Sequence, residues 1–252
     1  MICVKNWKPS VDQNKQVNIK EIKVVCKKCS LRQLCLPKLI DADDIKRLDD
    51  IIERKLPLKK GEYLFRQGKR FKSIYVVRSG SLKTYAPGIN GKEQIMGIHL
   101  PGELLGFDAL SEGRYNSSAK ALEISNLCEL PFDKVEKLSH KLPSLQHQLL
   151  SLMSKEVSNE YQTILFLGKK TAEERLATYI LSLSQRFKKR GFSPYEFHLS
   201  MSRGDIANYL NLAVETVSRM FTHFQKKKII RCDKKKVSIL DMDKLEHLAG
   251  TN

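Results

Sequence analysis

Three cysteines stand close together near the start of the chain, at Cys26, Cys29 and Cys35, in a Cys-x2-Cys-x5-Cys pattern. Thiolates bind zinc and iron–sulfur clusters, and the two lysines between the first two cysteines favour the thiolate form. Both kinds of site are usually completed by four ligands, so the segment is one ligand short. The spacing leaves open a zinc site, an iron–sulfur cluster and bare redox-active thiols.

A fourth ligand must come from elsewhere, and Cys3, Cys128 and Cys232 are the candidates. Cys128 lies in an apolar, β-rich stretch, where a free cysteine often serves as a small core residue. The six histidines are scattered, and neither a phosphate-binding loop nor a His and Glu ligand pair accompanies the thiols. The residues therefore favour a binding protein over a metalloenzyme, without identifying the fourth ligand.

A second group of residues, near the C-terminus, has the chemistry of DNA recognition. A helix capped at Ser202 is followed by a short break and by a second helix over 214–225, and this second helix carries Glu215, Ser218 and Arg219 on neighbouring turns. Arginine can donate two hydrogen bonds to guanine, glutamate can accept one from cytosine, and serine can act as a donor or an acceptor. The sequence predicts a helix-turn-helix whose second helix enters the major groove.

The charge of the chain points to the same partner. Lys and Arg number 45 against 28 Asp and Glu, which gives a net charge of +17. Between Arg186 and Lys236 the chain has 13 Lys and Arg but only 4 Asp and Glu. Because this excess surrounds the predicted helix-turn-helix, it favours a polyanion such as double-stranded DNA. A basic hairpin over 229–240 follows as a predicted wing.

Apolar runs long enough for a membrane helix or a secretory signal do not occur in the sequence. The sequence therefore predicts a cytoplasmic protein with no membrane partner. Structural disulfides are not expected in that compartment, which leaves all six cysteines available for other roles.

The elements that position these residues divide the chain in two. Helical spacing over 41–54 precedes a region between Gly61 and Gly113 that holds nine of the 13 glycines. Short β-rich stretches alternate with these glycines, which is typical of an antiparallel barrel or roll. The stretches cover residues 73–77, 81–85, 94–100 and 127–132.

A long helix is expected from Pro143 to Gly168, with the glycine at its end. One narrow apolar stripe predicts a dimer-forming seam, although such a stripe can also pack on the chain's own roll. Glu160 interrupts the stripe. Across a two-fold axis it would meet its own copy, and the repulsion of two carboxylates would keep the protein monomeric until a signal favours the dimer. The alternative is that Glu160 faces solvent. The stripe consists of Leu149, Met153, Val157, Ile164 and Leu167.

The order of roll, long helix and winged helix-turn-helix resembles the CRP/FNR superfamily of transcription regulators. The run from Val214 to Arg219 is similar to the recognition helix of the FNR (fumarate and nitrate reduction) type, and the resemblance spans Cys26 to Ala249. Residues 102–109, 172–177 and 190–194 also look like that type.

The resemblance implies an α+β fold with an N-terminal antiparallel β-roll of the cyclic-nucleotide-binding kind, a long dimerisation helix and a C-terminal winged helix-turn-helix. The expected parts are an arm with the cysteine segment (1–40), the roll (41–142), the dimerisation helix (143–168) and the DNA-binding domain (169–252).

The resemblance also implies an oxygen-labile [4Fe-4S] cluster on Cys26, Cys29, Cys35 and Cys128. The family's mode of action implies a regulator, not an enzyme. It dimerises while the cluster is intact, binds TTGAT-like inverted repeats in promoter DNA, and contacts RNA polymerase to control anaerobic genes. The alternative is a zinc-stabilised or thiol-redox regulator of the same fold without an iron–sulfur cluster.

Several positions depart from patterns in the superfamily. Cyclic-nucleotide-binding relatives hold ribose with Gly-Glu and phosphate with Arg-Ser, whereas the matching positions here are Gly106-Phe107 and Asn116-Ser117, so no cyclic nucleotide is expected. Ala213 replaces the hydroxyl residue that usually caps the recognition helix. Lys92 replaces an acid in a loop that faces polymerase in relatives, which puts that contact in doubt.

Overall fold

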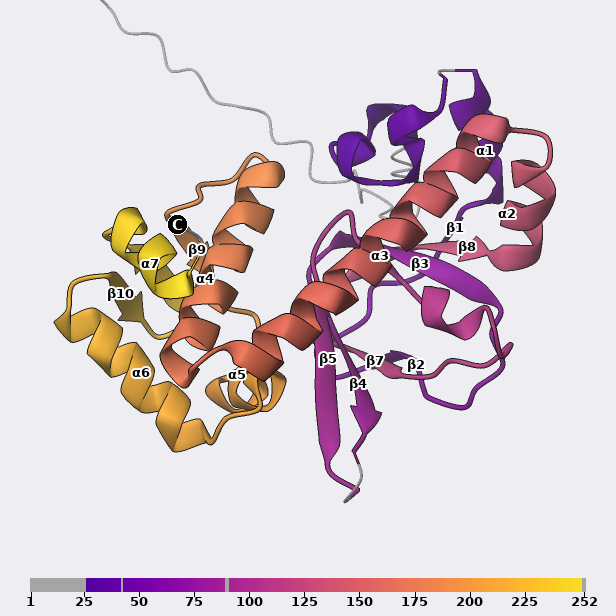
Figure 1. The fold of residues 1–252 in the computed structure, drawn as a ribbon. Coiled ribbons are helices and arrows are strands. Elements are labelled where there is room, and N and C mark those ends of the chain that lie inside the picture. Colours follow the sequence, from indigo (N-terminus) through magenta and orange to yellow (C-terminus); the bar gives the residue numbers. More distant parts are fainter. Residues whose placement is uncertain (1–25, 42, 89–90, 251–252) are drawn as a thin grey trace, which may run out of the picture.

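The first half of the chain is an antiparallel β-roll, and the second half is mostly helical with a small sheet (Figure 1). The α+β class and the predicted order of roll, long helix and winged helix-turn-helix are confirmed. The computed structural model describes residues 26–41, 43–88 and 91–250, without the side chains of residues 37, 39, 159, 160, 162, 164–167 and 169.

Two four-stranded sheets, with all neighbouring strands antiparallel, form the roll. The buried side chains of Phe65, Tyr75, Leu82 and Tyr115 fill the space between the sheets. One sheet has the order β1 (Glu53–Arg54), β8 (Asn126–Pro131), β3 (Ser73–Ser79), β6 (Leu104–Leu105). The other has the order β2 (Tyr63–Phe65), β7 (Ser118–Ala121), β4 (Leu82–Pro87), β5 (Glu93–His99).

The four β-rich stretches predicted from the sequence correspond to β3, β4, β5 and β8. At the turn between β3 and β4, Gly80 has a φ of +79°, and a Cβ there would lie 2.4 Å from the Ile124 carbonyl oxygen. Only glycine fits this turn, which is the physical reason for the glycine-punctuated pattern.

The cysteine segment and two short helices cover the outer face of the β1-β8-β3-β6 sheet. Their apolar side chains form a second core that includes Leu36, Leu48, Ile74 and Leu130. The segment has three short 3₁₀ helices, η2 (Cys26–Lys28), η3 (Arg32–Leu34) and η4 (Leu36–Leu39), and the helices are α1 (Asp44–Ile51) and α2 (Phe132–Ser139). Helix α2 was not predicted from the sequence.

Helix α3 (Pro143–Lys169) runs from the roll to the C-terminal half (Figure 1). Pro143 begins it as predicted, but Gly168 lies within the last turn, so the prediction that this glycine ends the helix is wrong. In the ranges that the structure describes, no helix is both long and apolar enough to cross a membrane.

The apolar stripe of α3 is only partly as predicted. Met153 and Val157 are exposed, but Leu149 packs against the core beneath the cysteine segment, so its assignment to a dimer seam is wrong. The side chains of Glu160, Ile164 and Leu167 lie outside the described residues. The exposed apolar side chains are Leu150, Met153, Val157 and Tyr161, which follow one another at intervals of three or four residues.

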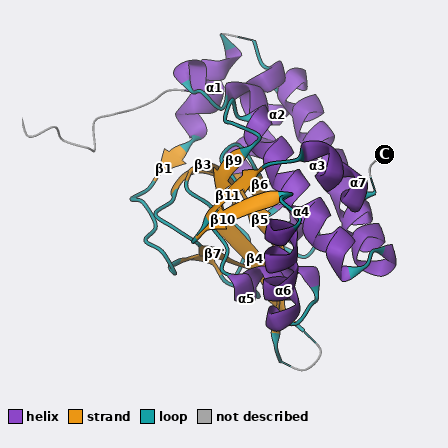
Figure 2. Cartoon of the chain, turned by 90° about the vertical axis from the view of Figure 1, so that its left-hand side faces the viewer, coloured by secondary structure: helices purple, strands orange, loops and turns teal. Residues whose placement is uncertain are grey.

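Four helices and a three-stranded sheet of order β10-β11-β9 form the C-terminal half, and their buried core continues into the roll through Tyr85, Ile95, Ile98, Leu100 and Leu122. Figure 2 shows how helices and strands are distributed. A capping box at Thr171 and Glu174 opens α4, as predicted. The basic hairpin of β10 and β11 confirms the predicted wing. The elements are α4 (Ala172–Lys189), β9 (Glu196–His198), α5 (Arg203–Leu210), α6 (Val214–Lys226), β10 (Ile230–Asp233), β11 (Lys236–Ile239) and α7 (Met242–Ala249).

Candidate cysteine centre and DNA-reading helix

Four cysteines from two distant parts of the chain line one cavity. Cys26, Cys29 and Cys35 come from the segment of 3₁₀ helices, and Cys128 comes from β8, a central strand of the sheet beneath it. The remaining walls are mostly apolar and include Leu36, Leu48, Ile52, Val76 and Leu130. Within the described ranges, no three His, Cys, Asp or Glu side chains are already arranged to hold a metal ion.

Burial dominates the protonation of these thiols. It raises the pKa of Cys35 to about 12, and it raises the pKa of Cys128 above its ordinary value. Burial also raises the pKa of Cys26, and the neighbouring Asp49 carboxylate adds to that shift. The prediction that lysines beside the thiols would favour thiolates is wrong for Cys26 and Cys35, because the lysines are exposed to solvent while the sulfurs are withdrawn from it. Metal binding here would have to release protons.

One carboxylate on α1 fixes the start of the cysteine segment. The backbone N–H of Cys26 donates to Asp49 Oδ1 at 3.1 Å, and Arg54 Nη2 donates to the same oxygen. Although burial opposes its charge, the Arg54 guanidinium holds the pKa of Asp49 below its usual value. Arg54 pairs with Cys128 in the β1–β8 ladder, so this ion pair joins the two halves of the cysteine centre.

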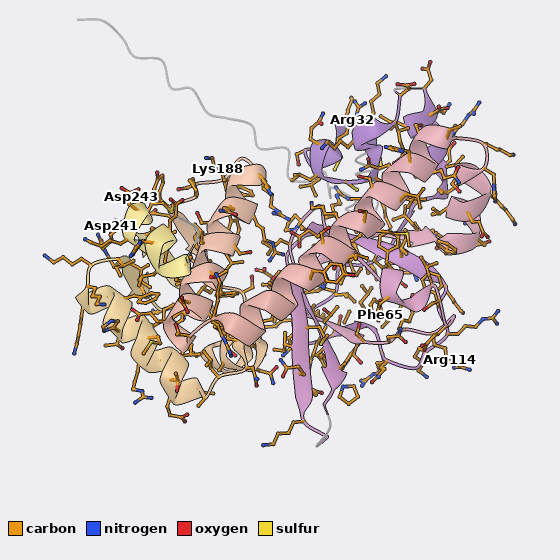
Figure 3. The ribbon with its side chains drawn as sticks, in the orientation of Figure 1. Arg32, Phe65, Arg114, Lys188, Asp241 and Asp243 are labelled. Atoms are coloured by element: carbon orange, nitrogen blue, oxygen red, sulfur yellow. The ribbon has the colours of Figure 1, made fainter. Side chains whose placement is uncertain are left out.

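Two further arginines line the cavity. Arg32 and Arg78 are both among its wall residues, and Figure 3 marks Arg32 on the cysteine segment. Arg32 Nη2 donates to the Ile40 carbonyl, but its Nε is buried with no hydrogen-bond partner among the described residues. A buried donor without a partner is costly, so the cavity can accept an electron-rich ligand at this point. Arg78 and Asp49 were not predicted from the sequence, because only the tertiary fold brings them to the cysteines.

The structure does not place either of the other two cysteines at this cavity. Cys232 lies on β10 of the wing, where its N–H donates to Gln225 Oε1 at 3.1 Å and its thiol faces Arg203. Cys3 falls outside the described residues. Of the two candidates for the fourth ligand that the structure describes, Cys128 is the one that lies with the trio.

The helix-turn-helix has the geometry expected from its sequence. Ser202 accepts a hydrogen bond from the N–H of Asp205 at the start of α5, and Asn211 ends this helix with a left-handed φ of 53°. Ala213 precedes α6 and forms no side-chain cap, which confirms that this helix lacks the usual cap. Helix α6 lies at the outer edge of the C-terminal half (Figure 1).

Helix α6 buries one face and leaves the other free. Val217 and Phe221 pack into the core, whereas Glu215, Ser218 and Arg219 are all exposed. Ser218 and Arg219 line a groove along the helix together with Thr222, His223 and Lys226. These polar and basic groups, on a helix that projects from the domain, can reach base edges and phosphates in a major groove.

The positions that match the nucleotide-binding residues of cyclic-nucleotide-binding relatives are Gly106-Phe107 and Asn116-Ser117. Phe107 packs against the core beneath the cysteine segment. Asn116 donates to the Asp108 carbonyl, and Ser117 Oγ donates to Asp108 Oδ2 at 3.2 Å. Asp108 thus lies directly beside the two residues that match the phosphate-binding pair.

Comparisons with known proteins agree with this architecture. The cyclic nucleotide-binding domain model matches residues 55–141, and the Crp-like helix-turn-helix model matches residues 174–248. The transcriptional activator protein Anr of Pseudomonas protegens is 51% identical over 225 residues, which cover 89% of this chain and 92% of that protein. The fumarate and nitrate reduction regulatory protein of Escherichia coli is 49% identical, with coverage of 89% and 90%.

Among solved structures, FixK2 from Bradyrhizobium japonicum superposes with a TM-score of 0.72 at 25% identity, covering 79% of this chain and 97% of that one. Half of the aligned residues are identical to those of a named transcriptional activator, over nearly nine-tenths of the chain. The chain therefore belongs to the CRP/FNR family of DNA-binding transcription regulators and is of the FNR type.

Proposed function

We propose that this regulator senses oxygen through a [4Fe-4S] cluster held by Cys26, Cys29, Cys35 and Cys128. One observation carries the proposal: these four sulfurs, from two distant parts of the chain, line a single and mostly apolar cavity. Ligation by four cysteine thiolates is the usual mode for such clusters. The unpartnered Arg32 Nε and the nearby arginine on β3 add donors and positive charge for a ligand set of four thiolates.

The four ligands give the segment a second attachment to the roll. A bound cluster supplies both the bonds that join the four sulfurs and their sensitivity to oxygen. Cys128 lies on β8, in the rigid sheet, so the three N-terminal cysteines are drawn to it when all four serve as ligands. Without that attachment the segment is held by its apolar contacts and by the Asp49 hydrogen bond to Cys26.

The segment packs on the start of α3, which makes this helix the natural recipient of the signal. Leu36 of the segment and Leu145 of α3 share one core. The exposed Leu150, Met153, Val157 and Tyr161 lie farther along the same helix and fit a seam with a second copy. We propose that loading of the four cysteines favours the dimer, and that Glu160 opposes it when they are empty.

A dimer places two copies of α6 on one face, as an inverted repeat requires. Glu215, Ser218 and Arg219 would read TTGAT-like half-sites in promoter DNA, and the bound dimer would contact RNA polymerase. In this proposal the protein works in the cytoplasm, without catalysis and without a cyclic nucleotide.

Iron and sulfide assays on anaerobically purified protein, with the visible absorption spectrum, test the cluster. About four irons and four sulfides per chain are expected, and serine in place of any one of the four cysteines should abolish iron retention. Cys232→Ser is the matched control, because Cys232 lies in the wing, and it should keep the iron. A colourless protein with one bound zinc would overturn the proposal in favour of a zinc-stabilised regulator. Full iron in Cys128→Ser would show that the fourth ligand is wrong.

A further inference from the structure

A charged contact joins the DNA-binding half to the roll. Glu103 lies in the loop after β5, and its Oε1 accepts hydrogen bonds from Arg186 Nε at 3.0 Å and from Arg190 Nη2 at 2.6 Å. The same arginines bind the backbone of β5 and of that loop, since Arg186 Nη2 donates to the Ile98 carbonyl at 2.6 Å and Arg190 Nε to the Pro101 carbonyl at 2.7 Å. The C-terminal end of α4 is thus fixed to one short stretch of the roll.

The contact is partly buried and has several hydrogen bonds. The side chain of Arg190 is 4% exposed, and Arg186 also pairs with Glu103 Oε2. Although burial opposes the charge, the two guanidinium groups hold the pKa of Glu103 at about 2. Ion pairs with several hydrogen bonds accept few arrangements of their partners. This contact therefore helps to set where α4 lies.

The cysteine segment rests on the residue next to Glu103. Gly102 has a φ of +89°, and a Cβ there would lie 2.9 Å from Leu34 Cβ. Leu34 directly precedes Cys35, yet it is not among the residues that line the cysteine cavity. The backbone N–H of Gly102 donates to the Val77 carbonyl, which ties the loop to β3. Leu34 thus contacts the loop that presents the Glu103 carboxylate.

A second set of contacts between the two halves involves no residue of the cysteine segment. Lys83 of β4 pairs with Asp205 of α5 at 2.5 Å. Asn208 Nδ2 donates to the Glu93 carbonyl, and its Oδ1 accepts from the Ile95 N–H at 2.6 Å. These contacts hold α5 on the outer strands of the roll. Of the two sets, the contact at Glu103 is the one placed to respond when the cysteine segment moves.

We propose that Glu103 is a positioning residue for DNA binding, which transmits the seating of the cysteine segment through Leu34 and Gly102 to α4 within one subunit. The proposal rests on the proposed function, because loading of the cysteines is what seats the segment. Helix α4 shares a core with α6, since Leu176 and Phe221 belong to the same buried cluster. A change at the end of α4 therefore reaches the helix that reads DNA, in addition to any change in dimerisation.

Hydrogen exchange of the full-length protein, with and without anaerobic loading by iron and sulfide, tests this route. In the wild type, loading should slow exchange in residues 26–35, 99–105 and 180–192. In Glu103→Gln it should still slow exchange in residues 26–35 and 99–105 but no longer in residues 180–192, because the segment seats on Gly102 while α4 no longer follows. At equal dimer fraction by sedimentation, DNA affinity of the loaded variant should fall about tenfold, a typical coupling between sites.

Two further variants keep the test decisive. Glu53→Gln is the matched control, since it removes a carboxylate paired with Lys134 at 3.0 Å on the roll surface, and it should behave as the wild type. Leu34→Ala leaves the arginine contacts intact and should uncouple residues 180–192 in the same way, even if Glu103→Gln fails to fold. If loading still slows hydrogen exchange of residues 180–192 in Leu34→Ala, this inference is overturned. Absence of bound iron in the wild type would instead overturn the proposed function.

Discussion

Arg219 gives the sharpest test of how α6 recognises DNA. Its side chain is exposed on the groove-lining face of the helix, and it forms no hydrogen bond or ion pair with another described residue. Removing it in Arg219→Ala should therefore leave the free energy of unfolding unchanged within about 0.5 kcal/mol, as for an unpartnered surface residue. Any effect then falls on DNA binding.

The size of that effect depends on what Arg219 contacts. A bidentate contact to guanine contributes about 1–3 kcal/mol of discrimination, which is roughly a fivefold to 150-fold loss of affinity for the cognate inverted repeat. Affinity for random DNA should change little. The dependence of affinity on salt should also be unchanged, because no phosphate contact is lost. Titration of labelled duplexes at several salt concentrations measures all three quantities.

Lys226 provides the matched control, since it lines the same groove in the last turn of the helix. If Lys226 contacts a phosphate, the Lys226→Ala variant should lose affinity equally for cognate and random DNA. The salt slope of log affinity should fall in magnitude by about 0.9, one released counterion. If Arg219→Ala behaves like Lys226→Ala, then Arg219 contacts a phosphate and the base-reading argument is refuted.

Three other outcomes follow from the structure and, for Glu160, from the sequence. Ala213→Ser should give α6 a cap and raise the free energy of unfolding by about 1 kcal/mol, and no gain in urea denaturation would show that the serine does not cap the helix. The Glu160→Ala variant should dimerise and bind DNA in air without iron, because it removes the carboxylate repulsion expected at the seam. If the variant sediments as a monomer, as the empty wild type is expected to do, this prediction is contradicted. Burial opposes the charge of Glu103, but Arg186 and Arg190 lower its pKa from 4.5 to about 2. The Glu103 carboxylate should therefore stabilise the fold by about 3 kcal/mol above pH 4.5, and this stabilisation should be lost as the pH falls toward 2. His99 titrates beside it, with its pKa lowered by burial to about 4, so the measurement is the difference between wild type and Glu103→Gln across pH, and a difference that does not shrink in acid would refute it.

Local patterns were enough to predict the elements that depend on local interactions. The capping boxes at Thr171 and Ser202 satisfy backbone donors within four residues, and both are formed. The two-residue strands β1 and β6 could not be predicted, because each is defined only by its partner in the sheet. Leu149 was misassigned because helical periodicity cannot separate a face that packs on the chain's own roll from one that meets a second copy.

The candidate site shows the same division. The spacing of the cysteine trio identified it as a ligand segment, but only the pairing of β8 with β1 and β3 explains why Cys128 lies beneath it. Asp49 carries no signal in the sequence, since an acid on an amphipathic helix usually faces solvent. The protonation of the thiols was predicted wrongly, because charge along the chain was weighed without burial.

That protonation bears on how the cysteine segment can act as a switch. Empty, Cys26, Cys35 and Cys128 are neutral and apolar, so the segment can stay packed on the sheet by the contacts of Leu36 and its neighbours. In the proposed function, the same sulfurs would bind the cluster as thiolates, and the arginines of the cavity would then face negative charge. A switch needs two states within a few kcal/mol of each other. Neutral thiols in a mostly apolar cavity keep the empty state from being too costly, which leaves the balance to be decided by the ligand.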